Sequence, residues 1–352
     1  MRQVSGYFLI LFMIFSFVVA LPAAVQGYRT TEKFTPDMAV NGGWASQYEK
    51  EFADVITLRK PGLTLWGMAE LALFRGGRPG VLIGRDGWLF SDEEFTYAQN
   101  REALITRHKA MIGQVIDRLH HDGVAVAVAL LPAKSRIAES KLGRFRYPSY
   151  NRALYGDILA MLRTRDVFAP DLNAALRNDP ESFLRTDTHW SPQGARIAAD
   201  AVATAIRQKG KIGLETQGFI LEEQAPESLK GDLLRYVPAG PLLERFSFGR
   251  VEVPQHAAIT SAADDGGESA LFGDVSLPVT LVGTSYSANG SWNFADYLKV
   301  ALQSDLFNAA DEGRGPFATM RDYLDSAAYK TNPPQLVIWE IPERYMALPE
   351  AE

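Results

Sequence analysis

An unbroken apolar run at residues 124–131 is the feature that most constrains how this chain folds. It reads Val-Ala-Val-Ala-Val-Ala-Leu-Leu, without charge, which is typical of a strand buried on both faces of a parallel sheet. Residues 101–121 before it place apolar side chains three and four positions apart and predict an amphipathic helix, which Gly123 ends. A helix followed by a doubly buried strand predicts an α/β fold.

The same alternation continues along the chain and predicts a mainly parallel sheet flanked by helices. Helices are expected at residues 150–164 and 192–210, the latter capped by Ser191, and strands at 167–168, 277–282 and 336–341. Short strands are expected around turns at residues 79–80 and 84–90, and a β-rich or irregular insertion at about residues 212–275. One domain, residues 28–352, that includes this insertion is the simplest organisation.

Composition narrows the range of functions. The 352 residues are 47% apolar, with a formal charge of −6, which suits a globular protein with a sizeable core. Nothing suggests a nucleic-acid partner, although a local basic cleft would still admit an anionic polymer. The absence of cysteine excludes thiolate catalysis, disulfides and Cys-ligated zinc. There is no glycine-rich nucleotide loop either, and we predict no cofactor.

The N-terminus has the pattern of an export signal. Arg2 precedes an apolar run at residues 7–21, and Pro22-Ala23-Ala24 follows. A buried core helix would usually alternate with charge, which this run does not. Residues 1–27 are therefore expected to be a cleaved signal peptide or an uncleaved membrane anchor, and both alternatives stay open.

A candidate nucleophile follows the strand predicted at 277–282. Gly283 permits a tight bend, Ser285 stands in the turn, and a helix is expected from about residue 293. A serine at such a sheet edge, near free N–H groups that bind an oxyanion, is typical of nucleophile turns. Taken alone, such a motif is more often an ordinary capped turn.

A candidate base lies in a loop before the helix that Ser191 caps. The chain has five histidines, and only His189 directly precedes a well-capped helix and follows an acid, Asp187, by two residues. Asp187 could orient the imidazole of His189 toward Ser285. In the alternative interpretation, Asp187 caps a turn and His189 packs against Trp190.

Two further features are weaker. One Asp-x-His supplies at most two metal ligands and no His-Glu-x-x-His pair is present, so no metal site is predicted. Arg314, between two glycines, either reaches a carboxylate or an oxyanion or is a solvated loop residue.

The two motifs together resemble those of the AlgJ/AlgX family of alginate O-acetylation proteins. The resemblance spans about residues 80–341 and is carried by Asp-Thr-His-Trp-Ser-Pro-Gln-Gly-Ala at 187–195, Gly-Thr-Ser-Tyr-Ser at 283–287 and Gly-Arg-Asp-Gly-Trp-Leu-Phe at 84–90. It implies an SGNH-hydrolase-like fold in circularly permuted form. Thr284 replaces the Asp of the general SGNH motif and the Asp-x-His precedes the serine, and both features match this family.

The resemblance also implies roles for individual residues. Asp187, His189 and Ser285 correspond to a catalytic triad. Arg314 corresponds to an oxyanion or substrate contact, and Lys134 and Tyr286 are expected near the substrate. The single domain expected, without a carbohydrate-binding domain after residue 341, resembles the AlgJ-type members.

The function implied is an O-acetyltransferase that moves acetyl through Ser285 onto hydroxyls of an exopolysaccharide, with mannuronate residues of alginate as the expected acceptor. It would work in the periplasm, tethered to the inner membrane by the N-terminal segment. The implied partners are an anionic polysaccharide, a membrane-bound O-acyltransferase that supplies acetyl, and other exopolysaccharide acetylation proteins. A polysaccharide acetylesterase with the same triad and a non-catalytic polysaccharide-binding assembly subunit remain as alternatives.

Overall fold

The computed structural model describes residues 2–350 except 32, 57–58, 75, 178, 180, 211, 215–216, 238–247 and 262–276. The chain divides into two compact units. The first is Met1–Gly77 with Val237–Pro241, and the second is Arg78–Tyr236 with Leu242–Glu352.

A parallel sheet forms the centre of the second unit, with the strand order β3-β8-β6-β7. Its strands are β3 (Ala125–Leu131), β6 (Val279–Val282), β7 (Leu306–Asn308) and β8 (Leu336–Pro342). The strands predicted at 124–131, 277–282 and 336–341 are confirmed. Phe168, where a short strand is expected, makes only a single parallel bridge to Ala127. The short edge strand β7 is not among the predicted strands.

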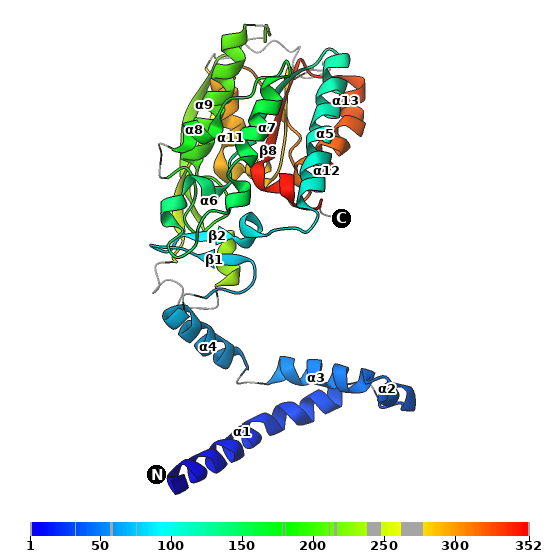
Figure 1. Cartoon of the computed structure of the whole chain (residues 1–352), viewed down its shortest axis with the longest axis vertical. Coiled ribbons are helices and arrows are strands. Elements are labelled where there is room, and N and C mark those ends of the chain that lie inside the picture. The colour runs from blue at the N-terminus through cyan, green and yellow to red at the C-terminus, as the bar shows by residue number, and fades with distance from the viewer. Residues whose placement is uncertain are drawn as a thin grey trace. The chain divides into compact units, whose positions relative to one another are not determined.

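Helices cover both faces of this sheet (Figure 1). Alternate residues of β3 point to opposite faces, so that Val126, Val128 and Leu130 belong to one apolar cluster while Ala127 and Ala129 belong to the other. One layer contains α5 (Arg101–His121), α7 (Leu154–Arg163), α12 (Gly315–Asp325) and α13 (Ala327–Thr331), and the other contains α8 (Leu172–Arg177), α9 (Pro192–Lys209) and α11 (Phe294–Leu302). The sheet is therefore buried on both sides, as its apolar strands predict.

Two of the predicted helices are confirmed at both ends. α5 has the predicted bounds, and α9 begins after Ser191, whose Oγ accepts the N–H of Gly194, and ends at Gly210 with a positive φ of 60°. The helix predicted at 150–164 starts later, at Leu154, because a short 3-10 helix, η3 (Ser149–Asn151), follows Pro148.

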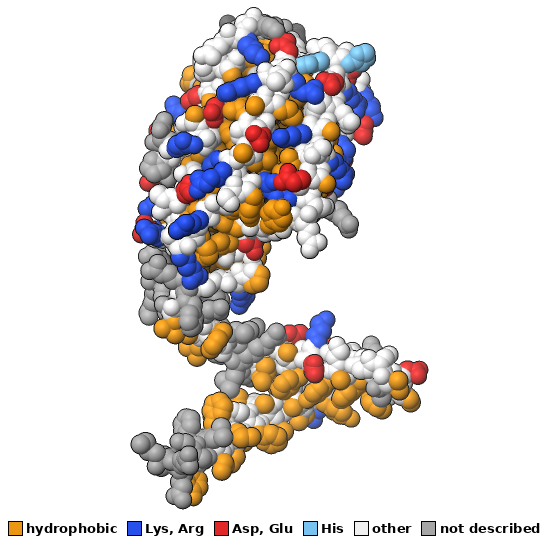
Figure 2. Space-filling view, in the orientation of Figure 1, with side chains coloured by type: hydrophobic (Ala, Val, Ile, Leu, Met, Phe, Trp, Pro, Cys, Tyr) orange, Lys and Arg blue, Asp and Glu red, His pale blue; other side chains and the backbone are white. Residues whose placement is uncertain are grey.

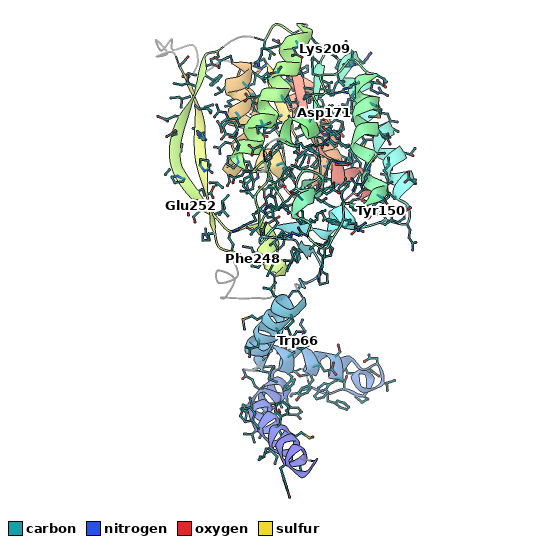
Figure 3. All side chains as sticks on the ribbon, turned by 60° about the vertical axis from the view of Figure 1, so that its left-hand side comes forward. Trp66, Tyr150, Asp171, Lys209, Phe248 and Glu252 are labelled. Atoms are coloured by element: carbon teal, nitrogen blue, oxygen red, sulfur yellow. The ribbon has the colours of Figure 1, made fainter. Side chains whose placement is uncertain are left out.

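The predicted insertion is β-rich where the structure describes it. β4 (Phe219–Leu229) and β5 (Val251–Thr260) pair as an antiparallel hairpin, with a register shift between Gln224 and Glu227. Figure 3 shows Glu252 on this hairpin beside the helical layers, and the N–H of His256 donates to Asn293 at the start of α11. Residues 215–216, 238–247 and 262–276 of the insertion lie outside the described part of the chain.

Short elements connect the strands at the edge of the sheet where their carboxyl ends meet. A hairpin of β1 (Val81–Ile83) and β2 (Leu89–Ser91) forms as expected, with Asp86 and Gly87 at positive φ in its turn. The remaining short elements are helices, namely η1 (Asp92–Phe95), α6 (Lys134–Ile137), η2 (Glu139–Lys141), η4 (Asp232–Tyr236), α10 (Ser285–Ala288), η7 (Gly290–Trp292) and η8 (Glu343–Ala347).

The first unit is helical, although residues 28–60 show few periodic signals. It contains α1 (Arg2–Thr30), α2 (Pro36–Val40), α3 (Gly43–Val55) and α4 (Arg59–Phe74). Ile10–Thr30 has a mean hydropathy of 2.1 and is long and apolar enough to cross a membrane. Apolar side chains gather on the surface of these helices in Figure 2. α3 lies against α1 at Gly27, where an added Cβ would stand 3.0 Å from the Phe52 nitrogen.

Candidate active site

Ser285 stands where β6 ends and α10 begins. The preceding Thr284 has extended backbone and caps the helix by accepting the N–H of Tyr286. Gly283 is required by close packing rather than by backbone conformation, because a Cβ there would lie 2.6 Å from the Glu340 carboxylate and 2.9 Å from its Cβ. Ser285 is the first residue of α10, so its N–H has no acceptor one turn back within that helix and is free to bind an oxyanion.

Glu340 of β8 supports this turn. Its side chain is fully buried, and its Oε2 accepts the Thr284 N–H at 2.7 Å and the Ser287 hydroxyl at 3.2 Å. The Thr284 hydroxyl also donates to it, at 3.0 Å. Burial raises the pKa of Glu340, and these hydrogen bonds oppose that rise. The nucleophile turn is thus held by a carboxylate from the neighbouring strand.

The structure brings Ser285, His189 and Asp187 into one hydrogen-bonded chain. His189 Nε2 lies 2.7 Å from Ser285 Oγ, and His189 Nδ1 lies 2.6 Å from Asp187 Oδ1. Both contacts are within hydrogen-bonding distance for proton transfer from serine to histidine. Chemically, such an arrangement is suited to activate a serine hydroxyl for attack on an acyl group and to hold the imidazole in one tautomer.

Asp187 is held on both carboxylate oxygens. Oδ1 also accepts the His189 N–H at 2.9 Å, and Oδ2 accepts the Asp232 N–H at 2.8 Å. Burial acts to raise the pKa of Asp187, but the hydrogen bonds and the charge of His189 outweigh burial and lower it. Asp187 therefore remains ionised and can stabilise an imidazolium beside it.

The carboxylate of Asp232 in turn binds Thr188, the residue between Asp187 and His189. Its two carboxylate oxygens accept the Thr188 N–H at 2.8 Å and the Thr188 hydroxyl at 2.6 Å. Gly231 makes the approach possible, since a Cβ at this position would lie 2.2 Å from the Thr186 carbonyl oxygen. The segment that follows β4 thus forms part of the site, although no motif in the sequence marks Asp232.

Aromatic side chains join the loop of His189 to the loop of Ser285. The Tyr286 hydroxyl donates to the Thr188 carbonyl at 2.8 Å, and Trp190 Nε1 donates to the Tyr286 carbonyl at 3.1 Å. The His189 ring stacks on Trp292, with centroids 5.1 Å apart. These contacts restrict the imidazole to the plane in which it reaches the serine.

A pocket of about 200 Å³ opens onto Ser285 and His189. It is lined by Gly80, Ser91, Asp92, Glu93, Thr188, His189, Asp232, Leu233, Arg235, Tyr236, Ser285, Arg344 and Tyr345. The lining comes from the β1–β2 hairpin, η1, the loops of His189 and Ser285, η4 and η8, so that the carboxyl edge of the sheet faces the pocket, as expected for open α/β sheets.

The other three predicted site residues lie outside this lining. Arg314 is half exposed at the start of α12, where it pairs with Asp322, and it borders a different, smaller pocket. Lys134 is 1% exposed and donates to the carbonyls of Leu89, Arg185 and Asp187. Tyr286 is buried between the catalytic loops. The geometry therefore favours a positioning role for Lys134 and Tyr286, which hold the loops in place, over contact with the substrate.

The pocket contains an arginine that the motifs do not point to. Arg344 follows β8 and lines the pocket with Ser285, and its Nη1 donates to the Tyr286 hydroxyl at 2.9 Å. One signal was available, because Arg344 comes three residues after the strand predicted at 336–341 and must lie at its carboxyl edge. Arg314 stands out in the sequence because glycines flank it, but flanking glycines do not show whether a residue lies beside the pocket.

Asp187, His189 and Asp232 place ligand-type atoms within 4.8 Å of one another, a spacing that a metal ion can bridge. Hydrogen bonds already engage these atoms. The Nδ1 of His189 faces Asp187, and both Asp232 oxygens accept from Thr188. The donor set therefore fits a hydrogen-bonded triad better than a metal centre.

A three-layer α/β unit with serine, histidine and aspartate in one chain of hydrogen bonds at the sheet edge belongs to the class of serine-dependent acyl-transfer and hydrolytic enzymes. A family model described as "SGNH hydrolase-like domain, acetyltransferase AlgX" matches residues 81–343, which is most of the chain. The chain belongs to this family and is an SGNH hydrolase-like O-acetyltransferase.

Individual relatives agree with this assignment. The chain is 40% identical over 324 residues to the probable alginate O-acetylase AlgJ of Pseudomonas fluorescens, a match that covers 91% of this chain and 81% of that protein. The solved O-acetyltransferase domain of Pseudomonas putida AlgJ is 39% identical, with a TM-score of 0.69 over 78% of this chain and 94% of that one. Pseudomonas aeruginosa AlgX shares the fold at 21% identity, with a TM-score of 0.57 over 76% and 63% of the two chains.

Proposed function

We propose that this enzyme acetylates hydroxyl groups of mannuronate residues in alginate through an acetyl-enzyme on Ser285. The observation that carries the proposal is the chain of hydrogen bonds from Asp187 through His189 to the Ser285 hydroxyl. The polymer is inferred from the relative in Pseudomonas fluorescens, which is named a probable alginate O-acetylase.

In the first step, His189 Nε2 takes the hydroxyl proton as Ser285 Oγ attacks the carbonyl carbon of an acetyl donor. Asp187 accepts the Nδ1–H and stabilises the imidazolium that forms. The tetrahedral oxyanion is bound by the Ser285 N–H at the start of α10. Collapse of this intermediate expels the donor's leaving group, which receives the proton from His189, and leaves acetyl on Ser285.

In the second step, a sugar hydroxyl replaces the leaving group in the pocket. His189 takes its proton as the hydroxyl oxygen attacks the acetyl carbonyl, and the proton then returns to Ser285 Oγ as the ester bond to the enzyme breaks. The outcome is transfer where the sugar hydroxyl reaches the acetyl-enzyme before water, and hydrolysis otherwise.

The expected location and partners belong to the same proposal. α1 is suited to anchor the chain in the inner membrane, with the second unit in the periplasm beside the polymer. A membrane-bound O-acyltransferase is the proposed source of acetyl, and other exopolysaccharide acetylation proteins are the proposed partners. The family description names the acetyltransferase AlgX, which supports the proposal that this enzyme and other acetylation proteins act on the same polymer.

The experiment combines the purified chain, an aryl acetate donor and a mannuronate oligomer. We expect mass spectrometry to show oligomers in which one or more hydroxyl hydrogens are replaced by acetyl, since the second step forms an ester at the sugar oxygen. Release of acetate without any gain in mass by the oligomer, at every oligomer concentration, would indicate an esterase instead.

Ser285→Ala is the matched control. It is expected to abolish both the mass gain and the covalent adduct formed by a sulfonyl fluoride, since the attacking oxygen is removed. An unchanged rate of polymer acetylation in this variant would favour the non-catalytic alternative.

A further inference from the structure

We propose that Arg344 binds the carboxylate of a uronate residue of the acceptor and thereby makes the enzyme selective for anionic sugars. The inference rests on the proposed function, because it names a contact for the proposed polymer. Arg344 and Ser285 line the same pocket, so a sugar whose hydroxyl reaches the acetyl-enzyme has its neighbouring groups within this lining.

Hydrogen-bond donors remain available on Arg344. Its side chain is only 7% exposed, and its Nε is a buried nitrogen without a hydrogen-bond partner among the residues that the structure describes. Nη1 is used by the Tyr286 hydroxyl, at 2.9 Å. A carboxylate is a suitable ligand for a guanidinium that has an unused buried donor, because the carboxylate can accept two parallel hydrogen bonds from the planar edge of the guanidinium.

The guanidinium is also held rigidly. It lies 5.4 Å from the ring centre of Tyr286 and 4.9 Å from that of Tyr345. Since Tyr286 directly follows the nucleophile, a group bound to Arg344 has a defined position relative to Ser285. Preorganisation of this kind favours selectivity because little side-chain entropy is lost when the ligand binds.

The acids of the pocket do not neutralise this arginine completely. Asp92 accepts the N–H of Gly80 at 2.7 Å, and Asp232 accepts from Thr188 through both oxygens. Glu93 approaches Arg344 Nε only to 3.5 Å, and its side chain is 52% exposed. Because its side chain is half exposed, Glu93 can turn to solvent when a substrate carboxylate takes its place.

A second cation lines the same pocket. Arg235 is exposed on η4, with its guanidinium 4.8 Å from the ring centre of Tyr236. Its charge adds to that of Arg344 and strengthens the attraction of a polyanion to the pocket. Arg235 raises the rate of encounter, whereas Arg344 is the buried contact that discriminates.

The test compares two acceptors with the full-length enzyme and an aryl acetate donor. One is a mannuronate oligomer, and the other is the same oligomer with its carboxylates reduced to hydroxymethyl groups. The wild-type enzyme is expected to prefer the uronate oligomer in kcat/KM for acetyl transfer. Arg344→Gln is expected to lower this preference by about 10- to 100-fold, the range for a hydrogen bond to a charged group.

Two variants calibrate the result. Arg344→Lys keeps the charge but not the two parallel donors, and it is expected to retain part of the preference. Arg165→Gln removes an arginine that pairs with Asp117 and does not line the pocket, and its preference should equal that of the wild-type enzyme. Should Arg344→Gln not fold, the binding of both oligomers to the wild-type enzyme at rising salt gives a second measurement, since only the uronate oligomer should weaken.

Two results would overturn the inference. One is an unchanged preference in Arg344→Gln, whether transfer to both acceptors falls equally, as for an oxyanion contact, or stays the same. The other is equal binding of both oligomers to the wild-type enzyme. The proposed function fails in a different way, through the absence of transfer to any acceptor by the wild-type enzyme.

Discussion

Asp187 is the residue on which the proposed chemistry depends most strongly after the serine. Asp187→Asn preserves the size of the side chain but removes the charge that stabilises the imidazolium and selects its tautomer. We expect Ser285 acylation by an aryl acetate to slow by about 10³- to 10⁴-fold, as for the comparable change in other serine triads. Burst kinetics would measure it, and a loss smaller than about tenfold would contradict the orienting role.

Asp187 should also affect stability in a pH-dependent way. Its pKa is lowered in the folded chain, so its stabilising contribution is present above the pKa of the unfolded chain, about 3.9, and is lost as the pH falls through the folded value. The difference in unfolding free energy between the wild-type enzyme and Asp187→Asn should shrink as the pH falls from about 5 to below about 4. Urea titrations across this pH range would measure it, and a difference that stays the same at low pH would contradict a lowered pKa.

Substitution of Lys134 tests whether this buried side chain has a structural role rather than a catalytic one. Burial lowers the pKa of Lys134 to about 7, and nearby Glu94 and Asp187 oppose that change. Lys134→Met leaves three carbonyl acceptors without their donor, and we expect a loss of about 2–4 kcal/mol in unfolding free energy. Denaturant melts would measure this loss. The control Lys141→Met, which removes an exposed ion pair with Asp86, should lose at most about 1 kcal/mol of unfolding free energy.

At the scale of elements, the nucleophile turn depends on how closely β6 and β8 approach. Gly283→Ala would press a methyl group against Glu340, whose carboxylate already holds Thr284 and Ser287. We expect this variant to lose about 1–3 kcal/mol of stability and most of its Ser285 acylation, because the turn must shift. Thermal melts and adduct formation would measure both effects.

Gly290→Ala is the matched control for this change. Gly290 lies in the same loop region, and an added Cβ meets nothing within 4 Å. Its stability and acylation should stay close to those of the wild-type enzyme. Equal effects of the two substitutions would show that the strand contact at Gly283 is not what positions Ser285.

In the whole molecule, the first unit is proposed to anchor the second unit, which carries the candidate active site, to the membrane. Removal of residues 1–30 takes away α1, which carries the candidate span Ile10–Thr30. We expect the full chain to stay with the membrane fraction through an alkaline carbonate wash, and the shortened chain to be released while its triad still reacts with a sulfonyl fluoride. Release of the full chain by the wash would contradict an inserted anchor.

Much of the element pattern could be predicted because local rules govern it. The helix Arg101–His121 and the strand after it follow from apolar periodicity, and the cap at Ser191 follows from local hydrogen bonding. Among the helices of residues 36–74, which escape prediction, α4 has weak apolar periodicity and α2 has only five residues. β7 escapes prediction because it is a short edge strand with two exposed residues. Contacts with the rest of the unit decide such elements.

The class of fold, the apolar N-terminal segment and the pair of motifs around His189 and Ser285 follow from the order of the amino acids alone. Which charged residues share the site emerges only in the folded chain, because it depends on which strands and loops become neighbours. β8 lies directly beside β6, and this pairing places Glu340 against the Ser285 turn and Arg344 in the pocket, whereas Arg314, at the start of α12, borders a different pocket. Pairings between residues so distant in the chain leave no periodic or local signal in the sequence.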